Sequence, residues 1–352
     1  MLPTTVFRQS DMAETAAKTT KKEWQFDSTT PILLLVVTIP LSMFLWAGNR
    51  TFQIIRHSDD EQIPPTRWLA SILIPIAFLV WGLKRGSVNL SGAMMGFCVG
   101  FVMTLANYCF LACLVIFFVT SSKATKFRAK EKRKIEVDFK EGGQRNWIQV
   151  LCNSGMAPQL ALLYIFEIGV GQRPIDFIED FRASWFALGV MSAFACSNAD
   201  TWASELGTVL SSSDPRLITS LKKVPRGVNG GVSIMGIVVS VLGGLAVGVS
   251  FYLTIILTVN SSILEHSPPQ WPVVVLGAAA GLFGSVIDSF FGATLQYSGV
   301  HKKTGVIVEQ PGPEVKYICG RRILDNHSVN LLSNIVTAIV MPRVANLFWP
   351  YY

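Results

Sequence analysis

Apolar residues form long runs over most of the chain, and short polar segments separate these runs. A helix needs about 20 predominantly apolar residues to cross the hydrocarbon core of a bilayer, and several runs approach or exceed this length. The pattern therefore predicts nine membrane-spanning helices. They cover residues 31–47, 68–83, 92–106, 108–122, 147–169, 183–206, 230–258, 271–296 and 328–348.

The apolar stretch between residues 92 and 122 allows two interpretations. A single helix of this length would extend about 46 Å, which is more than the thickness of a bilayer core. Two tight spans that turn near Asn107 and Tyr108 fit the bilayer better, and one long tilted helix is the alternative.

Composition supports the same fold class. Half of the residues are hydrophobic and only 15% are charged, a balance that fits several buried apolar helices better than one soluble core. We therefore predict an all-α, polytopic integral membrane bundle. The sequence contains no GxxxxGK[ST] loop, no HExxH and no GxSxG, so the nucleotide-binding, zinc-protease and hydrolase classes that use these motifs are not indicated.

Charge gives the expected orientation. If the N-terminus is cytosolic, 24 of the 30 Lys and Arg residues fall on the cytosolic side, as positive residues usually do. Residues 1–30 are then a disordered cytosolic tail, and residues 31–352 form the transmembrane domain. Residues 123–146 form a basic cytosolic loop, which we interpret as a topology determinant beside anionic headgroups. The net charge of +7 therefore lies on the cytosolic face, and it does not indicate a nucleic-acid partner. We expect the protein to reside in the endoplasmic reticulum or another endomembrane.

Two acidic residues stand at matching positions on separate predicted helices. Asp200 follows 17 residues from the start of the span at Ala183, and Asp288 follows 17 residues from Trp271. Each acid then lies about 25 Å from the outer end of its helix, near the inner boundary of the hydrocarbon. We predict that the two carboxylates meet there and hold Mg²⁺, which accepts one or two protein carboxylates with phosphate and water.

Glu205 is a less direct candidate. On a straight helix Asp200 and Glu205 lie on two faces about 100° apart and do not form a chelate, so Glu205 is expected to assist the pair. In the alternative interpretation, all three acids pair with arginines as buried structural charges.

Other polar residues are predicted at the cytosolic ends of neighbouring spans. Helix N-termini and glycine turns offer free N–H groups to phosphate oxygens, and arginines add charge-assisted hydrogen bonds. The predicted phosphate- and substrate-binding residues are Arg145, Asn146, Lys223, Arg226, Asn229, Gly230, Gly231, Asp325 and Asn330.

Five segments, taken in order, carry a family resemblance. They are "KEGGQRNW", "ADTWASELG", "VPRGVNGGVSIMG", "GSVIDSFFGATLQYSG" and "ILDNHSVNLLSN". Together they resemble the animal transmembrane protein 19 family, which is related to the plant phytyl-phosphate kinase and to uncharacterised bacterial and archaeal membrane proteins. The likeness covers residues 65 to 350.

The resemblance implies a kinase that works on an isoprenoid substrate. A phytyl-phosphate kinase converts an isoprenoid monophosphate to the diphosphate with a nucleoside triphosphate, so the expected partners are the lipid bilayer and an isoprenoid phosphate. Such chemistry needs mainly positioning and charge neutralisation, which suits the predicted acids, cations and Mg²⁺. The alternatives are a lipid or small-molecule transporter or scramblase, and a CTP-dependent lipid nucleotidyltransferase that releases pyrophosphate.

Overall fold

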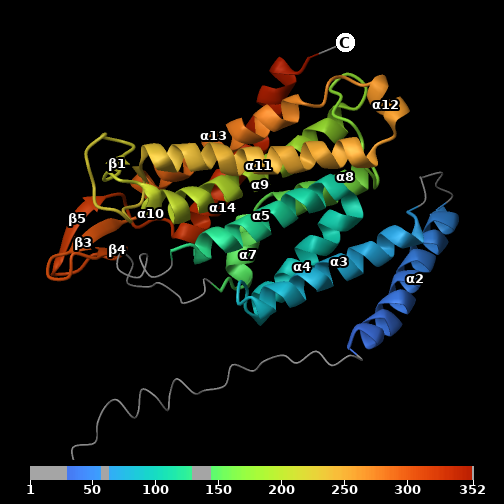
Figure 1. Cartoon of the computed structure of the whole chain (residues 1–352), viewed down its shortest axis with the longest axis horizontal. Helices are drawn as coiled ribbons and strands as arrows, with labels where there is room; N and C mark the ends of the chain where they lie inside the picture. The colour runs from blue at the N-terminus through green and yellow to red at the C-terminus, as the bar shows by residue number, and fades with distance from the viewer. Residues whose placement is uncertain (1–29, 57–62, 129–143, 351–352) are drawn as a thin grey trace, which may run out of the picture.

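The computed structural model describes residues 30–56, 63–128 and 144–350, which form a bundle of helices (Figure 1). In chain order the helices are α2 (Thr30–Arg56), α3 (Pro65–Lys84), α4 (Leu90–Ala106), α5 (Tyr108–Lys126), α7 (Trp147–Ser154), α8 (Ala157–Glu167), α9 (Phe181–Trp202), a π turn (Ala203–Gly207), α10 (Thr208–Leu210), α11 (Ile234–Thr258), α12 (Ser261–Glu265), α13 (Pro272–Leu295) and α14 (Asn326–Phe348). The predicted tail and most of the basic loop lie outside the described residues.

Five short strands correct the all-α prediction. Strands β1 (Arg216–Leu217) and β2 (Gly231–Val232) pair antiparallel, and β3 (Ser298–His301) lies between β4 (Ile307–Val308) and β5 (Val315–Cys319). The strands and α10 gather at one end of the bundle, and α12 lies at the other (Figure 1). Sequence analysis missed the five strands because each has only two to five residues, too few for a clear alternation of apolar and polar positions.

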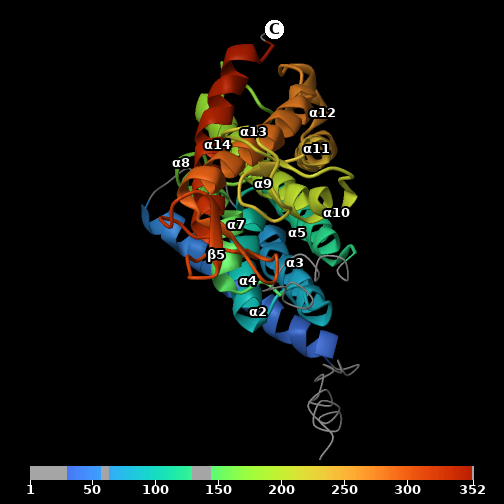
Figure 2. The same ribbon diagram turned by 90° about the vertical axis from the view of Figure 1, so that its left-hand side faces the viewer.

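Within the described residues, five helices are long and apolar enough to cross a membrane, namely α3, α5, α11, α13 and α14. A sixth span exists if α7 and α8, which meet at an angle of 61°, count as one. The nine predicted spans are therefore not confirmed. Helix α9 is not among the five, and it packs against α5, α8, α11, α13 and α14 (Figure 2). A helix covered by protein needs no apolar surface for lipid.

The chain breaks at Asn107, so residues 92–122 form two helices, as favoured above. Asn107 is extended, and its side chain accepts a hydrogen bond of 2.8 Å from the backbone N–H of Cys109 at the start of α5. The buried Arg67 guanidinium donates to the carbonyls of Leu105 and Ala106 at 3.2 and 3.3 Å. These contacts satisfy backbone groups that the end of α4 would otherwise leave without partners.

The segment predicted as one span over residues 147–169 is bent between α7 and α8. Gly155 has a positive φ of 53°, and the Asn334 side chain takes the place that a Cβ would need there. The Asn334 carbonyl oxygen accepts a hydrogen bond of 2.9 Å from the backbone N–H of Met156. Its amide nitrogen donates to the Ala193 carbonyl and the Ser197 hydroxyl of α9, at 2.8 and 2.9 Å.

Helices α11 and α13 approach each other through glycines. A Cβ on Gly244 of α11 would lie 2.3 Å from the Gly277 carbonyl oxygen and 2.8 Å from the Gly281 Cα of α13. No side chain fits at that distance, so the approach depends on the glycine. This packing places the C-terminal part of α13, which carries Asp288, beside the other helices of the site.

Candidate functional site

A cavity of ≈ 590 Å³ lies where the ends of α7, α9, α13 and α14 meet the π turn and β2. Nine of the twelve residues predicted for the site line this cavity. They are Arg145, Asp200, Glu205, Arg226, Asn229, Gly230, Gly231, Asp288 and Asn330. Most of the predicted site residues therefore line one cavity, although the sequence predicted neither the shape of the cavity nor much of its remaining polar lining.

The two predicted aspartates meet in this cavity. Asp200 lies in the last turn of α9, Asp288 lies in α13, and their carboxyl groups face each other within hydrogen-bonding reach. The Ser333 hydroxyl of α14 donates a hydrogen bond of 2.9 Å to Asp288 Oδ2. Three helices thus fix the geometry of the pair.

The π turn brings Glu205 closer to the pair than a straight helix would. It comprises residues 203–207, so it begins three residues after Asp200 and contains Glu205. A π turn holds more residues per turn than an α turn, which reduces the angle between positions five residues apart. Both side chains line the cavity and interact electrostatically. The straight helix assumed in the sequence analysis is wrong here, although Glu205 does not join the two aspartates as a third metal ligand among the described residues.

The two arginines of the cavity have different surroundings. Arg145 donates to the hydroxyls of Ser122 and Thr125 on α5, at 3.2 and 3.3 Å. Burial lowers the pKa of the Arg145 guanidinium, and the Glu205 carboxylate opposes this shift. An arginine stays charged despite such a shift, so Arg145 brings a positive charge to the cavity. Arg226 donates to backbone carbonyls of residues 208 and 211 and holds that end of α10 in place.

The turn before β2 carries Asn229 and Gly230, two of the residues predicted for the site. Gly230 has a φ of 79°, and a Cβ there would lie 2.4 Å from the Ala293 Cβ, so the turn needs glycine. The side-chain nitrogens of Asn229 and Gln296 are buried in the cavity wall, and neither has a hydrogen-bond partner among the described residues. Buried amide donors without partners cost free energy, and a ligand with oxygen acceptors would remove that cost.

Three predicted residues do not line the cavity. Asn146 caps α7 and accepts a hydrogen bond of 3.0 Å from the Gln149 backbone N–H. Asp325 caps α14, and hydrogen bonds from the Ser328 hydroxyl and backbone N–H lower the pKa of its carboxyl. Lys223 is exposed beside β1. The two caps account for the Asn and Asp at these positions.

Sequence analysis missed several polar residues that line the cavity. The Asn330 amide donates to the Asn153 side chain at 3.0 Å, and the hydroxyl of Ser240 donates to that of Ser285 at the same distance. Two missed residues lie at helical spacing from a named candidate: Asn153 is seven positions after Asn146, and Ser285 is three positions before Asp288. That spacing was the signal that would have identified them.

The acid pair suits a divalent cation that also binds ligands from outside the protein. Among the described residues no three His, Cys, Asp or Glu side chains are grouped as a metal site. Two carboxylates in contact repel each other when both are charged, so a proton or a cation between them lowers the energy. Mg²⁺ often takes only one or two protein carboxylates and completes its shell with phosphate oxygens and water. The donors present suit that ion.

These features define a polytopic helical membrane protein with a polar cavity at one end of the bundle. Residues 73–338 match the family described as integral membrane protein DUF92, and the chain belongs to this family. No solved structure matches the chain.

Relatives include proteins of a plant, an archaeon and a cyanobacterium. The chain is 41% identical over 280 residues to protein PGR of Arabidopsis thaliana, covering 80% of this chain and 96% of that protein. It is 26% identical over 276 residues to an uncharacterized membrane protein of Methanocaldococcus jannaschii, covering 78% and 92%. It is 28% identical over 240 residues to the chloroplastic protein VTE6 of Arabidopsis thaliana, covering 67% and 65%.

Proposed function

We propose that this protein is a membrane kinase that transfers a phosphoryl group from a nucleoside triphosphate to an isoprenoid monophosphate. The observation that carries the proposal is the contact between Asp200 and Asp288 in a cavity that also contains Arg145. Two carboxylates, the positive charge of Arg145 and amide donors without partners together match what phosphates and their metal ion require. The motif resemblance to relatives of the plant phytyl-phosphate kinase points to the isoprenoid substrate.

The reaction conserves atoms and charge without a further reactant. An oxygen of the lipid monophosphate attacks the γ-phosphorus of the nucleotide and forms a new P–O bond. The bond from that phosphorus to the oxygen bridging the β- and γ-phosphates breaks, which leaves a nucleoside diphosphate and a prenyl diphosphate. The substrate phosphate is itself the nucleophile, so no side chain has to act as one.

The residues of the cavity have distinct roles in this proposal. Asp200 and Asp288 would hold Mg²⁺, which when bound neutralises phosphate charge, and Glu205 assists the pair. Arg145 attracts and orients the phosphates through its positive charge. The amides of Asn229 and Gln296 and the backbone N–H of Gly230 donate to phosphate oxygens, while the Gly231 N–H donates to the Val228 carbonyl at 3.0 Å and holds the turn.

The proposal includes the location of the reaction. We place the cavity on the cytosolic side of the endoplasmic reticulum or another endomembrane, with the N-terminus on the same side, because 24 of the 30 basic residues then face the cytosol. A lipid phosphate at the membrane interface and a soluble nucleotide both reach a site at that depth. The same motifs support assignment of this chain to the animal transmembrane protein 19 branch of its family.

A direct assay tests the activity. Purified protein in nanodiscs is given Mg²⁺, a panel of nucleoside triphosphates and geranylgeranyl or phytyl monophosphate, and the products are resolved by mass. We expect prenyl diphosphate and nucleoside diphosphate in equal amounts, and loss of turnover in Asp200→Asn and Asp288→Asn. If no nucleotide is consumed, the kinase proposal is wrong. If either variant keeps full turnover, the metal assignment is wrong.

The same assay separates the two alternatives. Release of pyrophosphate with a nucleotide-linked lipid identifies a CTP-dependent nucleotidyltransferase. Movement of a fluorescent lipid phosphate between leaflets without nucleotide identifies a transporter or scramblase, and such proteins usually place buried acids near the bilayer midplane.

A further inference from the structure

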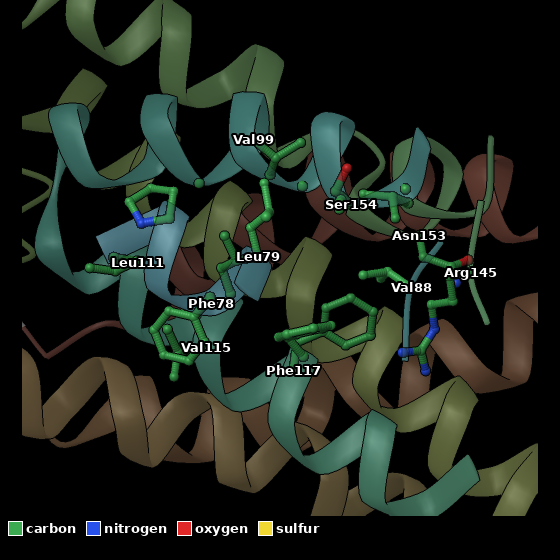
Figure 3. A pocket seen from close by; sticks show the side chains of 18 residues that line it. Phe78, Leu79, Val88, Val99, Leu111, Val115, Phe117, Arg145, Asn153 and Ser154 are labelled. Carbon is green, nitrogen blue, oxygen red and sulfur yellow. The ribbon is translucent and has the colours of Figure 1, made fainter. Parts of the chain in front are cut away.

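A second cavity, of ≈ 90 Å³, lies among α3, α4, α5 and α7 (Figure 3). Phe78 and Leu79 of α3, and Leu111 and Val115 of α5, line one part of it, and their side chains are apolar. The only polar side chains in its described lining are Arg145, Asn153 and Ser154, which are grouped together in Figure 3, away from Leu111 and Val115. The cavity is therefore apolar along its length and polar at one end.

The polar end is shared with the larger cavity. Arg145 and Asn153 line both cavities, so the two spaces adjoin at these residues. The backbone of Arg145 is held there by hydrogen bonds of 3.1 Å with Ser87 and Asn89, just before α4. An arginine can pack its aliphatic part against apolar groups while its guanidinium faces a polar region. Arg145 therefore stands at the boundary between the two environments.

We propose that the apolar cavity binds the hydrocarbon chain of the substrate while its phosphate occupies the polar cavity. This inference rests on the proposed function and adds to it a binding site for the lipid tail. The occupant is a prenyl chain, because it has to be apolar, flexible and linked to a group that Arg145 attracts. The first isoprene units then lie between α3, α4 and α5, and a longer chain continues toward the bilayer.

Gly96 of α4 gives a means to close this cavity. It lines the cavity, has an ordinary helical conformation, and a Cβ built there meets no atom within 4 Å. An added side chain therefore extends into open space and not into backbone. A Cβ added to Gly48 of α2 also meets no atom within 4 Å, and Gly48 does not line either cavity, so Gly48→Leu is the matched control.

The first test compares substrates of different chain length. The ratio of kcat/KM for geranylgeranyl monophosphate to that for dimethylallyl monophosphate is measured in the natural protein, Gly96→Ala, Gly96→Leu and Gly48→Leu. We expect the ratio to fall stepwise at position 96, by about tenfold or more in Gly96→Leu, since each isoprene unit excluded loses apolar burial. The ratio should not change in Gly48→Leu. An unchanged ratio in both Gly96 variants would overturn the tail site while leaving the kinase activity in place.

The second test does not depend on turnover. A farnesyl monophosphate analogue with a photoreactive diazirine in its chain is cross-linked to the protein in nanodiscs without nucleotide, and labelled peptides are identified by mass. We expect labels in α3, α4 and α5 that Gly96→Leu reduces and unlabelled geranylgeranyl monophosphate competes away. Labels confined to helices other than α3, α4, α5 and α7, or labelling that Gly96→Leu does not reduce, overturn the tail site. If labelling follows the expectation but no kinase activity is found, the tail site stands and the proposed reaction fails.

Discussion

Ser333 of α14 donates a hydrogen bond to the Asp288 carboxylate of α13, with 2.9 Å between Oγ and Oδ2. Ser333 is almost completely buried, so water does not replace this donor easily. The hydroxyl orients the Asp288 carboxylate, which also interacts with Asp200. A serine that was absent from the sequence-based candidates therefore supports the acid pair.

Ser333→Ala is expected to lower kcat by about tenfold to a hundredfold, as the loss of groups that orient metal ligands often does. It should also raise the Mg²⁺ concentration needed for half-maximal activity. The measurement is turnover across a Mg²⁺ titration. Ser192→Ala is the matched control, because Ser192 is buried in α9 and its hydroxyl has no hydrogen-bond partner among the described residues. Equal Mg²⁺ dependence in the two variants would exclude the orienting role.

Deletion of Ala203 tests the π turn. Removing one residue restores α-helical spacing, and Glu205 then follows Asp200 by four positions, about 40° around the helix. We expect a folded protein that loses little activity, as does Ala203→Ser, because Glu205 stays on the face of Asp200. Glu205→Gln, which keeps the π turn but removes the charge, should lose much more. Turnover and thermal unfolding in detergent are measured for the three variants. A deletion variant that is stable but as inactive as Glu205→Gln would show that the π turn itself is needed.

The cap at Asp325 predicts a pH-dependent stability. Because the folded pKa of Asp325 is lowered, its contribution is complete above the unfolded pKa and is lost as pH falls through the folded value. Asp325→Ala should destabilise the protein by about 0.5 to 2 kcal/mol at neutral pH, and by less in acid. The midpoint of thermal unfolding is measured between pH 7 and pH 3.

A neutral cap serves as the control for Asp325. Asn89 caps α4 through a hydrogen bond of 2.9 Å from the Gly92 backbone N–H, and its side chain does not titrate. The destabilisation in Asn89→Ala should therefore not change with pH. A destabilisation in Asp325→Ala that is equally independent of pH would contradict the charged cap.

Gly244→Ala is expected to separate α11 from α13. Its Cβ would lie 2.3 Å from a backbone oxygen, and such overpacking costs about 1 to 3 kcal/mol. Gly48→Ala adds the same methyl group to a helix with open space and should stabilise slightly, since alanine favours helix over glycine. Thermal unfolding of both variants in one detergent makes the comparison. Equal stability would show that the two helices can move apart without cost.

The sequence predicted the helices because apolar runs of this length have few alternatives, and it placed Asp200 and Asp288 at one level by counting residues along two spans. It also favoured the break at Asn107 on length alone. The bend at Gly155 was missed because Asn334, far along the chain, occupies the space beside it. The π turn was missed because one extra residue per turn leaves no mark in hydropathy. The short strands were missed because they depend on pairing between distant segments.

Asn334 has a mechanical consequence. Its one amide group joins the bend before α8 to α9 and α14, and Ser333 next to it joins α14 to α13. A rotation of α14 against the other three elements would break several of these hydrogen bonds at once. The four elements therefore behave as a single stiff joint around the acids. If the volume of the cavity changes during turnover, the displacement has to come from segments outside that joint.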